Sequence, residues 1–372
     1  MPRNAFLPEG SVLLVTEPVN PGGLAIYTSS LMQGLSEAAI PHLLLTSTRP
    51  GYQLLPKKEF DYVKISPSLF WSVWRPFAFR RLVAWARDTE PLLVHGLSAI
   101  TAPLCAHLAQ ALQVPYTVTV HHFQRRGSLR ADKHCQGIIA VSEPLRENIV
   151  NEAGISKELV RVIPAGIRIP VEPRTVPAQN AAGQSAPVPL ISTFGKLIPR
   201  KDIRTFLRMA RLVVDRLGRE CSFIVSGEGP EESALRKFAH ELQLDKQVTF
   251  CHGSAEHAQL LRDTDVYVQC SKAEGFGSMV LQAMAHGVPV VATSTGGMLS
   301  LIKDGETGYL VPAGDAEALA AKTLELLAEP ERAGRVGLAA QQAARESYSL
   351  EAMMTGTLEL YAEAVVTSAI TK

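Results

Sequence analysis

The chain has 372 residues, a length that predicts two domains rather than one. Apolar residues make up 46% of it and charged residues 20%, a globular composition that excludes disorder and collagen-like repeats. The formal net charge is +1, so the molecule as a whole has no electrostatic attraction for nucleic acid, although residues 1–170 hold 17 basic against 12 acidic side chains.

Short β-branched runs alternate with helical patterns along the first half of the chain, as in a doubly wound α/β sheet. Strands are expected at residues 12–15, 43–45, 63–65, 92–94, 116–120, 138–141 and 160–163. Residues 91–124 carry no charged side chain, but histidines and prolines interrupt them, and a membrane span needs about 20 uninterrupted apolar residues. We therefore expect a buried strand, a helix over 101–112 and another strand there.

Residues 170–189 are rich in proline, alanine and glutamine, lack periodicity, and predict a linker. The alternation then restarts, with strands expected at 190–194, 223–225, 248–250, 266–268, 290–291 and 309–311. We thus expect Rossmann-like domains over 1–169 and 190–346, and a terminal helix within 347–372 that returns to the first domain. Two such sheets place the carboxyl ends of their strands around a central cleft, where ligands bind.

Two glycine-rich turns precede helical patterns. Gly22 and Gly23 follow the first expected strand, where their backbone could approach a phosphate at a helix N-terminus, although a strand-to-helix turn needs glycine in any case. In the second half, residues 271–278 run into a helix expected over 279–286. Glu274 precedes that helix, and an acidic side chain beside an anion site suits sugar hydroxyls better than phosphate.

These segments resemble the retaining glycosyltransferases of family 4 (group 1), which have the two-domain GT-B fold, and the resemblance covers nearly the whole chain. The family's signature, E-G-F-G-x-x-x-x-E, A-x-G-x-P-V-V-A, G-G and D-G-x-x-G, stands here at residues 274–282, 285–292, 296–297 and 304–308. Further matches are residues 195–197 with Lys201 for its G-R-L and following lysine, 227–230 for its G-x-G-P, 118–121 for its strand ending in histidine, and Ser142 for its A-V-S-x segment.

The resemblance implies transfer of a hexosyl group, with retention and without a metal or cofactor, from a UDP- or GDP-linked sugar to a hydroxyl acceptor in glycan or glycolipid synthesis. It assigns the catalytic positions to His121, Lys201 and Glu274. The donor-binding residues that it implies are Gly22, Gly23, Lys196, Gly229, Gly275, Phe276, Gly277, Ser278 and Gln282. In this scheme the two lysines neutralise the diphosphate, while Glu274 and His121 hold the donor sugar.

The sequence departs from the family at Gln282, where the family has a second glutamate that accepts hydrogen bonds from the ribose. Glutamine keeps one acceptor but loses the charge, so we expect donor affinity to fall several-fold to about tenfold. Lys196 replaces an arginine and gives up bidentate geometry. These departures keep a second interpretation open, a non-catalytic subunit or glycan-binding scaffold of the same fold.

Three features also allow a structural interpretation. Asp263 and Asp265 resemble a metal-binding D-x-D motif, but they precede an expected strand where the family has an ordinary acidic strand start. His121 could be a satisfied histidine at a strand end. Lys201 could be a solvated lysine, although a cation at a helix N-terminus is unfavourable unless it shares an anion.

Residues 69–87 hold all three tryptophans and four arginines, a mixture that suits a bilayer surface or a lipid-linked acceptor. The aliphatic and arginine side chains fall on different helical faces, which is equally the pattern of a helix packed on its sheet. Five cysteines without a C-x-x-C pair and an N-terminus without an apolar signal favour the cytoplasm. Peripheral contact with the inner face of the membrane and ordinary packing both remain open.

Overall fold

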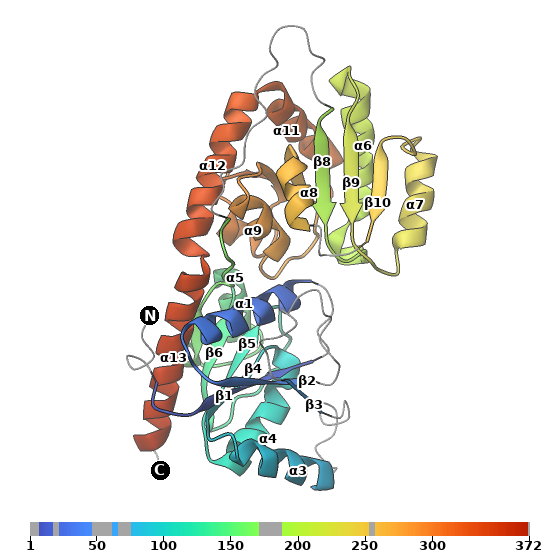
Figure 1. Ribbon diagram of the computed structural model, residues 1–372. Coiled ribbons are helices and arrows are strands. Elements are labelled where there is room, and N and C mark those ends of the chain that lie inside the picture. The colour runs from blue at the N-terminus through green and yellow to red at the C-terminus, as the bar shows by residue number, and fades with distance from the viewer. Residues whose placement is uncertain are drawn as a thin grey trace. The chain divides into compact units, whose positions relative to one another are not determined.

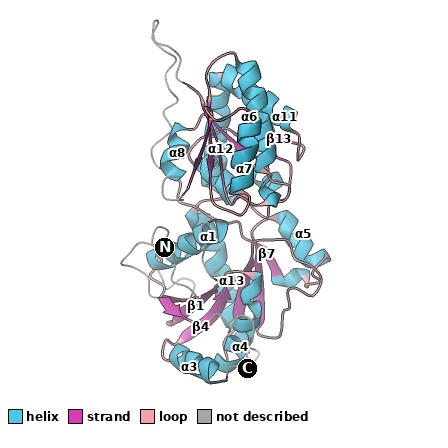
Figure 2. Cartoon of the chain, turned by 90° about the vertical axis from the view of Figure 1, so that its right-hand side faces the viewer, coloured by secondary structure: helices cyan, strands magenta, loops and turns pink. Residues whose placement is uncertain are grey.

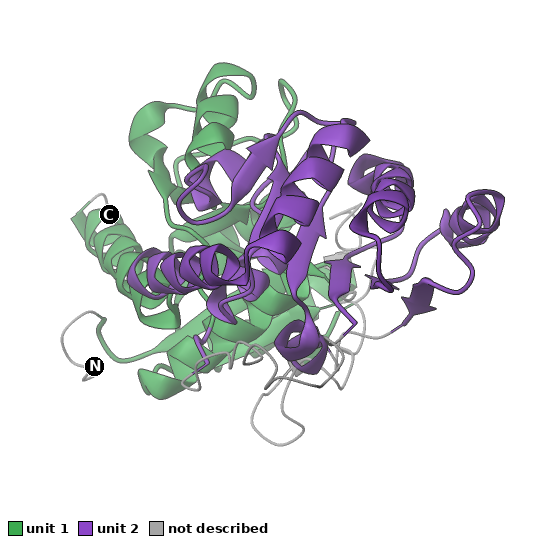
Figure 3. Cartoon of the chain, turned by 90° about the horizontal axis from the view of Figure 1, so that it is seen from above, with its two compact units in different colours: residues 1–167, 349–372 green, residues 168–348 purple. Residues whose placement is uncertain are grey.

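A computed structural model describes residues 7–17, 22–46, 62–65, 76–170, 188–252 and 257–370. The chain divides into two compact units, residues 1–167 with 349–372 and residues 168–348 (Figure 3). Most of the segment predicted as a linker, residues 171–187, lies outside the described residues. Each unit has one parallel sheet with helices packed against it (Figure 2).

The sheet of the first unit is parallel throughout its described strands and has the order β3-β2-β1-β4-β5-β6-β7. These strands are β1 (Ser11–Thr16), β2 (His42–Thr46), β3 (Tyr62–Lys64), β4 (Pro91–Gly96), β5 (Tyr116–Val120), β6 (Cys135–Ala140) and β7 (Val160–Val162). Continuous apolar runs form them because helices cover both faces of the sheet, and residues 12–15 of β1 are fully buried. The strand order reverses between β1 and β4.

In the described ranges of the first unit, five helices cover this sheet. They are α1 (Gly23–Glu37), α3 (Pro76–Arg87), α4 (Ala102–Leu112), α5 (Glu143–Asn151) and α13 (Leu350–Ile370), with 3-10 turns η2 (Ala99–Thr101) and η3 (Lys157–Leu159). Helix α13 comes from the far end of the chain and packs on α1 and β6, whereas α3 and α4 lie on the other face (Figure 1). Gly34 of α1 is required at this contact because a Cβ there would collide with the Met354 side chain.

The charge-free stretch 91–124 forms β4, α4 and β5, as predicted. Among the described residues, no helix combines the length and the apolar composition that crossing a membrane requires. The strand predicted over residues 138–141 begins three residues earlier in the structure, since Cys135 already pairs with Tyr116 of β5.

The sheet of the second unit has the order β10-β9-β8-β11-β12-β13, and its strand order reverses between β8 and β11. Its strands are β8 (Leu190–Phe194), β9 (Ser222–Ser226), β10 (Val248–Cys251), β11 (Val266–Gln269), β12 (Val290–Thr293) and β13 (Tyr309–Val311). Around them are η4 (Pro199–Lys201), α6 (Ile203–Leu217), α7 (Glu232–Glu241), α8 (His257–Asp263), α9 (Ser278–Ala285), α10 (Met298–Leu301), α11 (Ala316–Ala328) and α12 (Pro330–Ser347). The predicted α/β class, with two Rossmann-like sheets, is confirmed.

Helix α6 shows how the second unit forms its core. Its apolar side chains recur every three or four residues, and Phe206, Met209 and Val213 are fully buried against the sheet. The helix ends at Gly218, whose φ of 70° is left-handed and therefore favours glycine. Helices α6 and α11 cover one face of the sheet and α8 the other (Figure 2).

Candidate functional site

In the second unit, several predicted site residues lie at the carboxyl edge of the sheet. Strand β8 ends at Phe194 and leads into Lys196 and Lys201, while β11 ends at Gln269 and leads into Glu274. These two neighbouring strands flank the point where the strand order reverses. Open α/β sheets bind their ligands at this position, so the topology brings the predicted residues to a ligand-binding edge.

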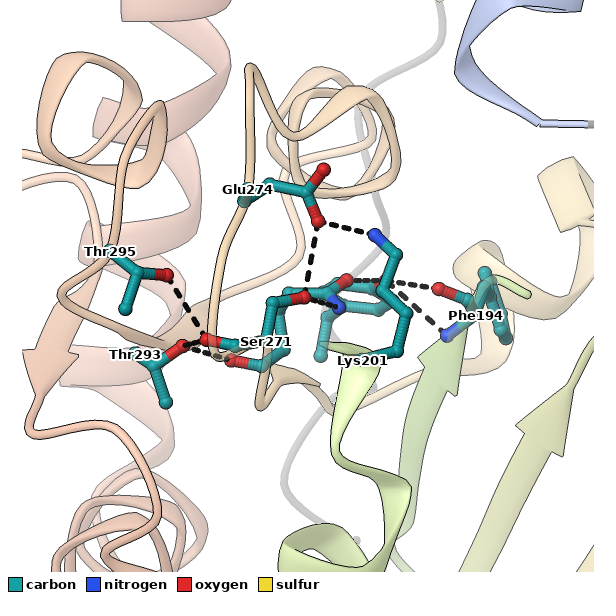
Figure 4. Close-up of polar contacts among 8 residues, drawn as sticks. Phe194, Lys201, Ser271, Glu274, Thr293 and Thr295 are labelled. Atoms are coloured by element: carbon teal, nitrogen blue, oxygen red, sulfur yellow. Dashed lines mark hydrogen bonds and ion pairs between the residues drawn. The ribbon is translucent and has the colours of Figure 1, made fainter. Parts of the chain in front are cut away.

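Lys201 and Glu274 form a buried ion pair between Nζ and Oε2 (Figure 4). Only 12% of the lysine side chain and 9% of the glutamate side chain are exposed. Burial alone raises the pKa of Glu274, but Lys201, Arg200 and the Ser271 hydroxyl outweigh it and hold that pKa below its usual value. Glu274 is therefore ionised at neutral pH, and the alternative of a solvated Lys201 does not hold.

A buried row of polar side chains leads to Glu274 from β11 (Figure 4). The Ser271 hydroxyl lies 3.1 Å from Glu274 Oε2, Gln269 Nε2 lies 2.9 Å from Ser271 Oγ, and Gln269 Oε1 lies 2.9 Å from the Tyr267 hydroxyl. Gln269 and Ser271 were not among the site residues predicted from the sequence. Their signal is the period-two spacing of 267, 269 and 271, which puts three polar side chains on one face of an extended segment.

The main chain of Ser271 is fixed as well. The hydroxyl groups of Thr293 and Thr295 both donate to its carbonyl oxygen, over 2.6 and 3.0 Å (Figure 4). Thr293 is the last residue of β12, the strand next to β11, and Thr295 lies in the loop that follows it. The loop between β11 and α9 is thus attached to the sheet at the residue whose side chain contacts Glu274.

Helix α9 begins directly after this loop, and its N-terminus carries no side-chain cap. The residue before it, Gly277, has a φ of 100°, and a Cβ at that position would collide with Met298. The predicted donor-binding residues Gly275, Phe276 and Ser278 lie at this helix start. Uncapped amides at a helix N-terminus, together with the helix dipole, attract anions.

Lys196 and Gly229 lie at the same edge of the sheet. Lys196 is exposed and has no ion-pair partner among the described residues. Gly229 approaches the backbone of Leu197 so closely that a Cβ would collide with the Leu197 carbonyl group. Close backbone packing therefore accounts for this glycine without reference to a ligand.

Gln282 lies one turn into α9 and is half-buried. Its backbone oxygen accepts a hydrogen bond from His286 Nδ1 at 2.8 Å. Its side-chain amide has no partner within the part of the chain that the structure describes. The amide is thus available to a ligand rather than committed to the core.

The first unit holds the other predicted residues, Gly22, Gly23 and His121. Gly22 precedes α1 with a φ of 142°, and this helix too begins without a side-chain cap. His121 follows β5, and the edge of its ring packs against Tyr27 at 4.7 Å between ring centroids. The ring hydrogen-bonds to the backbone of Leu97, but its Nε2 is buried and unpartnered among the described residues, so His121 is not a fully satisfied strand-end histidine. Burial, assisted by His122, lowers the pKa of His121 to about 3, so the ring is neutral at pH 7.

A buried hydrogen-bonded cluster lies beside His121. The Thr119 hydroxyl is 2.9 Å from the Tyr27 hydroxyl and 2.8 Å from His95 Nε2, and His95 Nδ1 bonds to the Tyr361 hydroxyl of α13. Burial, with a smaller contribution from His121, lowers the pKa of His95 to about 3. The cluster joins α1, β4, β5 and α13 through side chains.

The D-x-D segment has structural partners. Asp265 Oδ2 accepts a hydrogen bond from the Leu190 amide at 2.9 Å, and the Thr264 hydroxyl lies 2.9 Å from that of Ser192. Within the described ranges there is no group of three metal-ligating side chains. The segment therefore fastens β11 to β8.

The basic stretch 69–87 is described only from Pro76 onward, so Trp71, Trp74 and Arg75 lie outside the described residues. Helix α3 buries Leu82, Val83 and Ala86 and leaves Arg80, Arg81 and Arg87 exposed. Phe77 is 82% exposed. A surface hollow of about 240 Å³ is lined by Phe79, Arg80, Val83, Ala84, Arg87 and Ala111.

Both halves of the chain match known family models. Residues 21–169 match the family described as Glycosyltransferase Family 4, and residues 179–343 match Glycosyl transferases group 1. The chain is 30% identical over 250 residues to the D-inositol 3-phosphate glycosyltransferase of Rhodococcus erythropolis, which covers 62% of this chain and 56% of that protein. It is also 30% identical over 142 residues to the N-acetyl-alpha-D-glucosaminyl L-malate synthase of Bacillus anthracis, over 38% and 37% of the two chains. The matches thus span 56% and 37% of these relatives' length, which is less than two thirds in both cases.

Two solved structures share the fold over nearly the full length. A glycosyltransferase from Rickettsia africae has a TM-score of 0.78 at 16% identity and covers 96% of this chain and 99% of its own. An Anabaena protein in complex with UDP and glucose has a TM-score of 0.80 at 18% identity and covers 94% and 99%.

Proposed function

We propose, because the chain belongs to the group 1 glycosyltransferases of family 4 and has their GT-B fold, that it is a retaining, metal-independent glycosyltransferase. It moves a hexosyl group from a UDP- or GDP-linked sugar to a hydroxyl acceptor in glycan or glycolipid synthesis. The observation that carries this proposal is the buried Lys201–Glu274 pair beside the uncapped start of α9. A cation, a carboxylate and free amides at one sheet edge match the diphosphate and the hydroxyl groups of such a donor.

The residues divide the donor between them. Lys201, Lys196 and the amides at the start of α9 neutralise the diphosphate, and Gly22 and Gly23 add backbone amides at the start of α1. Glu274 accepts hydrogen bonds from the sugar hydroxyls, and Gln282 binds the ribose. His121, which is neutral, contacts the sugar through its unpartnered Nε2.

The reaction replaces one bond at the anomeric carbon. The bond to the diphosphate oxygen breaks, and the acceptor oxygen bonds to the same face of the sugar. The acceptor's hydroxyl proton passes to the departing phosphate, so neither a protein nucleophile nor a cofactor takes part. Charge develops on the leaving diphosphate, where lysine ammonium groups and helix amides stabilise it.

Electrostatic cost argues against the alternative of a non-catalytic scaffold, which rests on Gln282. Taking two charges out of water is unfavourable, and a buried ion pair is weak evidence for a stabilising role. The retention of an ionised, buried Lys201–Glu274 pair is therefore better explained by ligand binding.

Names of relatives support a hydroxyl acceptor, since they refer to inositol phosphate and malate.

The site of action in this proposal is the cytoplasm, with peripheral contact at the inner face of the membrane through residues 69–87. The exposed arginines and Phe77 of α3 support this contact.

The proposed donor site is tested by thermal unfolding with UDP, GDP and ADP and their common sugars. We expect one nucleotide at about 100 times its Kd to raise the midpoint by several degrees, because ligand binding stabilises the folded state. Lys201→Ala abolishes this shift. Lys272→Ala is the matched control, since Lys272 follows β11 on the same loop but is 61% exposed and pairs with Asp202. No shift with any nucleotide at millimolar concentration, or equal losses in both variants, would contradict the proposal.

A further inference from the structure

The hydrogen bonds leading to Glu274 have one consistent direction. An ionised carboxylate only accepts, so Ser271 must donate its single hydroxyl proton to Glu274 Oε2, 3.1 Å away. Ser271 Oγ then offers only lone pairs to Gln269. The amide nitrogen of Gln269 must therefore face Ser271 and donate to it over 2.9 Å.

The same reasoning continues back to β8. With its nitrogen on Ser271, Gln269 presents Oε1 to Tyr267, whose hydroxyl donates over 2.9 Å. The Tyr267 oxygen in turn accepts the Phe194 amide over 3.3 Å, and its hydroxyl also lies 3.3 Å from the Phe194 carbonyl oxygen. Because the hydroxyl has one proton and Gln269 Oε1 is the nearer acceptor at 2.9 Å, the protons of the row point from β8 toward the carboxylate of Glu274.

From this geometry we propose that Gln269 is a positioning residue that acts on Glu274 through Ser271. Gln269 fixes the Ser271 proton on Oε2, which keeps the carboxylate ionised and aimed while Oε1, which has no partner among the described residues, accepts a sugar hydroxyl. This role rests on the proposed function for the contact with the sugar, but not for the direction of the protons.

Burial makes a role beyond packing necessary. Gln269 is 1% exposed, and Tyr267 and Ser271 are fully buried. Burying an amide is unfavourable unless all its hydrogen bonds are made, and an apolar side chain of similar size would avoid that cost. The two threonine hydroxyls on the Ser271 carbonyl keep the backbone in place, so the Ser271 side chain can transmit a change at 269.

Two substitutions at position 269 separate positioning from packing. Gln269→Glu keeps the size of the side chain but can only accept, so the Ser271 proton turns away from Glu274 and a like charge is added. Gln269→Met also keeps the approximate size but removes the amide donor to Ser271 Oγ, so the Ser271 proton is no longer fixed on Glu274. Ser271→Ala removes the donor itself and serves as the second route if Gln269→Glu does not fold.

The first measurement needs no substrate. In the full-length protein labelled with ¹³C at glutamate carboxyl carbons, the Glu274 resonance is the one that Glu274→Gln removes. We expect it to titrate closer to neutral pH than in the wild type in Gln269→Glu and Ser271→Ala and, by a smaller amount, in Gln269→Met. A titration of Glu274 in Gln269→Met identical to that of the wild type would overturn the proposal.

The second measurement is the pH dependence of turnover with the donor identified by thermal shift. The ratio of kcat/KM at pH 5.5 to that at pH 8 should fall about tenfold in Gln269→Glu and Ser271→Ala, because one hydrogen bond to a charged group is lost. Gln269→Met should lower the ratio by a smaller factor, because it removes the amide donor to Ser271 without adding a charge. A wild-type ratio in Gln269→Met together with a lower overall rate would show a purely structural role. Absence of any donor turnover in the wild type would refute the proposed function alone, since the titration still decides the role of Gln269.

Discussion

Two anionic groups, the Glu274 carboxylate and the proposed diphosphate, compete for the positive charge of Lys201. In the structure Glu274 holds it, whereas the proposed reaction requires it for the diphosphate. We therefore expect Glu274→Gln to bind the nucleoside diphosphate about three- to tenfold more tightly, since one competing and repelling charge is removed. Transfer should nevertheless fall at least about a hundredfold, because the sugar loses its charged acceptor.

Titration calorimetry with the nucleoside diphosphate alone checks the first part, and initial rates with the donor check the second. Glu228→Gln is the control, because Glu228 lies at the same sheet edge, is exposed and makes no ion pair within the described residues. Its affinity should match the wild type. Binding by Glu274→Gln that is weaker than wild type would show that Glu274 does not compete for Lys201.

The residues of the site differ in how visible they are in the sequence. Glu274 and Lys201 can be recognised because they lie in loops that contain glycine at the ends of strands, which are the positions of an ordered motif. Their contact cannot be predicted from local pattern, since 73 residues separate them. Gln269 is harder to recognise, because the period-two spacing of residues 267, 269 and 271 is its only signal and no turn or motif marks it. The direction of its hydrogen bonds is what indicates a role.

At the scale of elements, helix α13 is attached to the first unit by a buried polar contact as well as by apolar packing. Tyr361 of α13 bonds to His95 of β4, and both side chains are fully buried. The helical spacing of residues 350–366 predicts the helix, and its apolar face predicts that it packs against another part of the protein. The partner of Tyr361 could not be predicted, because His95 lies 266 residues away in a strand that reads as uniformly apolar.

The neutral His95 makes the first unit sensitive to acid. Its pKa is about 3 in the folded state, whereas an unfolded histidine has a pKa of about 6.5. The unfolded state therefore binds more protons than the folded state between these two pH values. The contribution of His95 to the free energy of unfolding is fully present above pH 6.5 and should fall by up to about 1.4 kcal/mol per pH unit as the pH drops toward 3. Urea unfolding at pH 4, 5, 6 and 7 measures this slope.

His95→Gln should remove this contribution, because glutamine takes up no proton, and should leave the contribution of His121, whose pKa is also about 3. His107→Gln is the matched control, since His107 lies on the adjacent helix α4, is exposed and bonds only to the Pro103 carbonyl in the described structure. Its slope should equal that of the wild type. Parallel slopes in all three proteins would exclude His95 as the source of the acid sensitivity.

At the scale of the whole molecule, charge is divided unequally. Residues 1–170 carry an excess of basic side chains, while the remaining residues hold 20 basic against 24 acidic ones. Part of the basic excess lies on α3, where Arg80, Arg81 and Arg87 are exposed and make no ion pair among the described residues. Anionic lipid attracts such a surface by about 1 kcal/mol per basic residue near the bilayer.

We therefore expect the protein to pellet with vesicles of phosphatidylcholine containing 30% phosphatidylserine, because basic amphipathic helices bind anionic membrane surfaces. Binding should fall about tenfold or more in Arg80→Glu/Arg87→Glu, since two attractions become repulsions, and should weaken as salt is raised. Arg216→Glu/Arg335→Glu makes the same change in net charge on the second unit and should leave pelleting unchanged if α3 is the contact. Equal losses in both double variants would mean that net charge alone governs binding. Failure of the wild type to pellet would contradict membrane contact and would mean that α3 serves only to pack against α4.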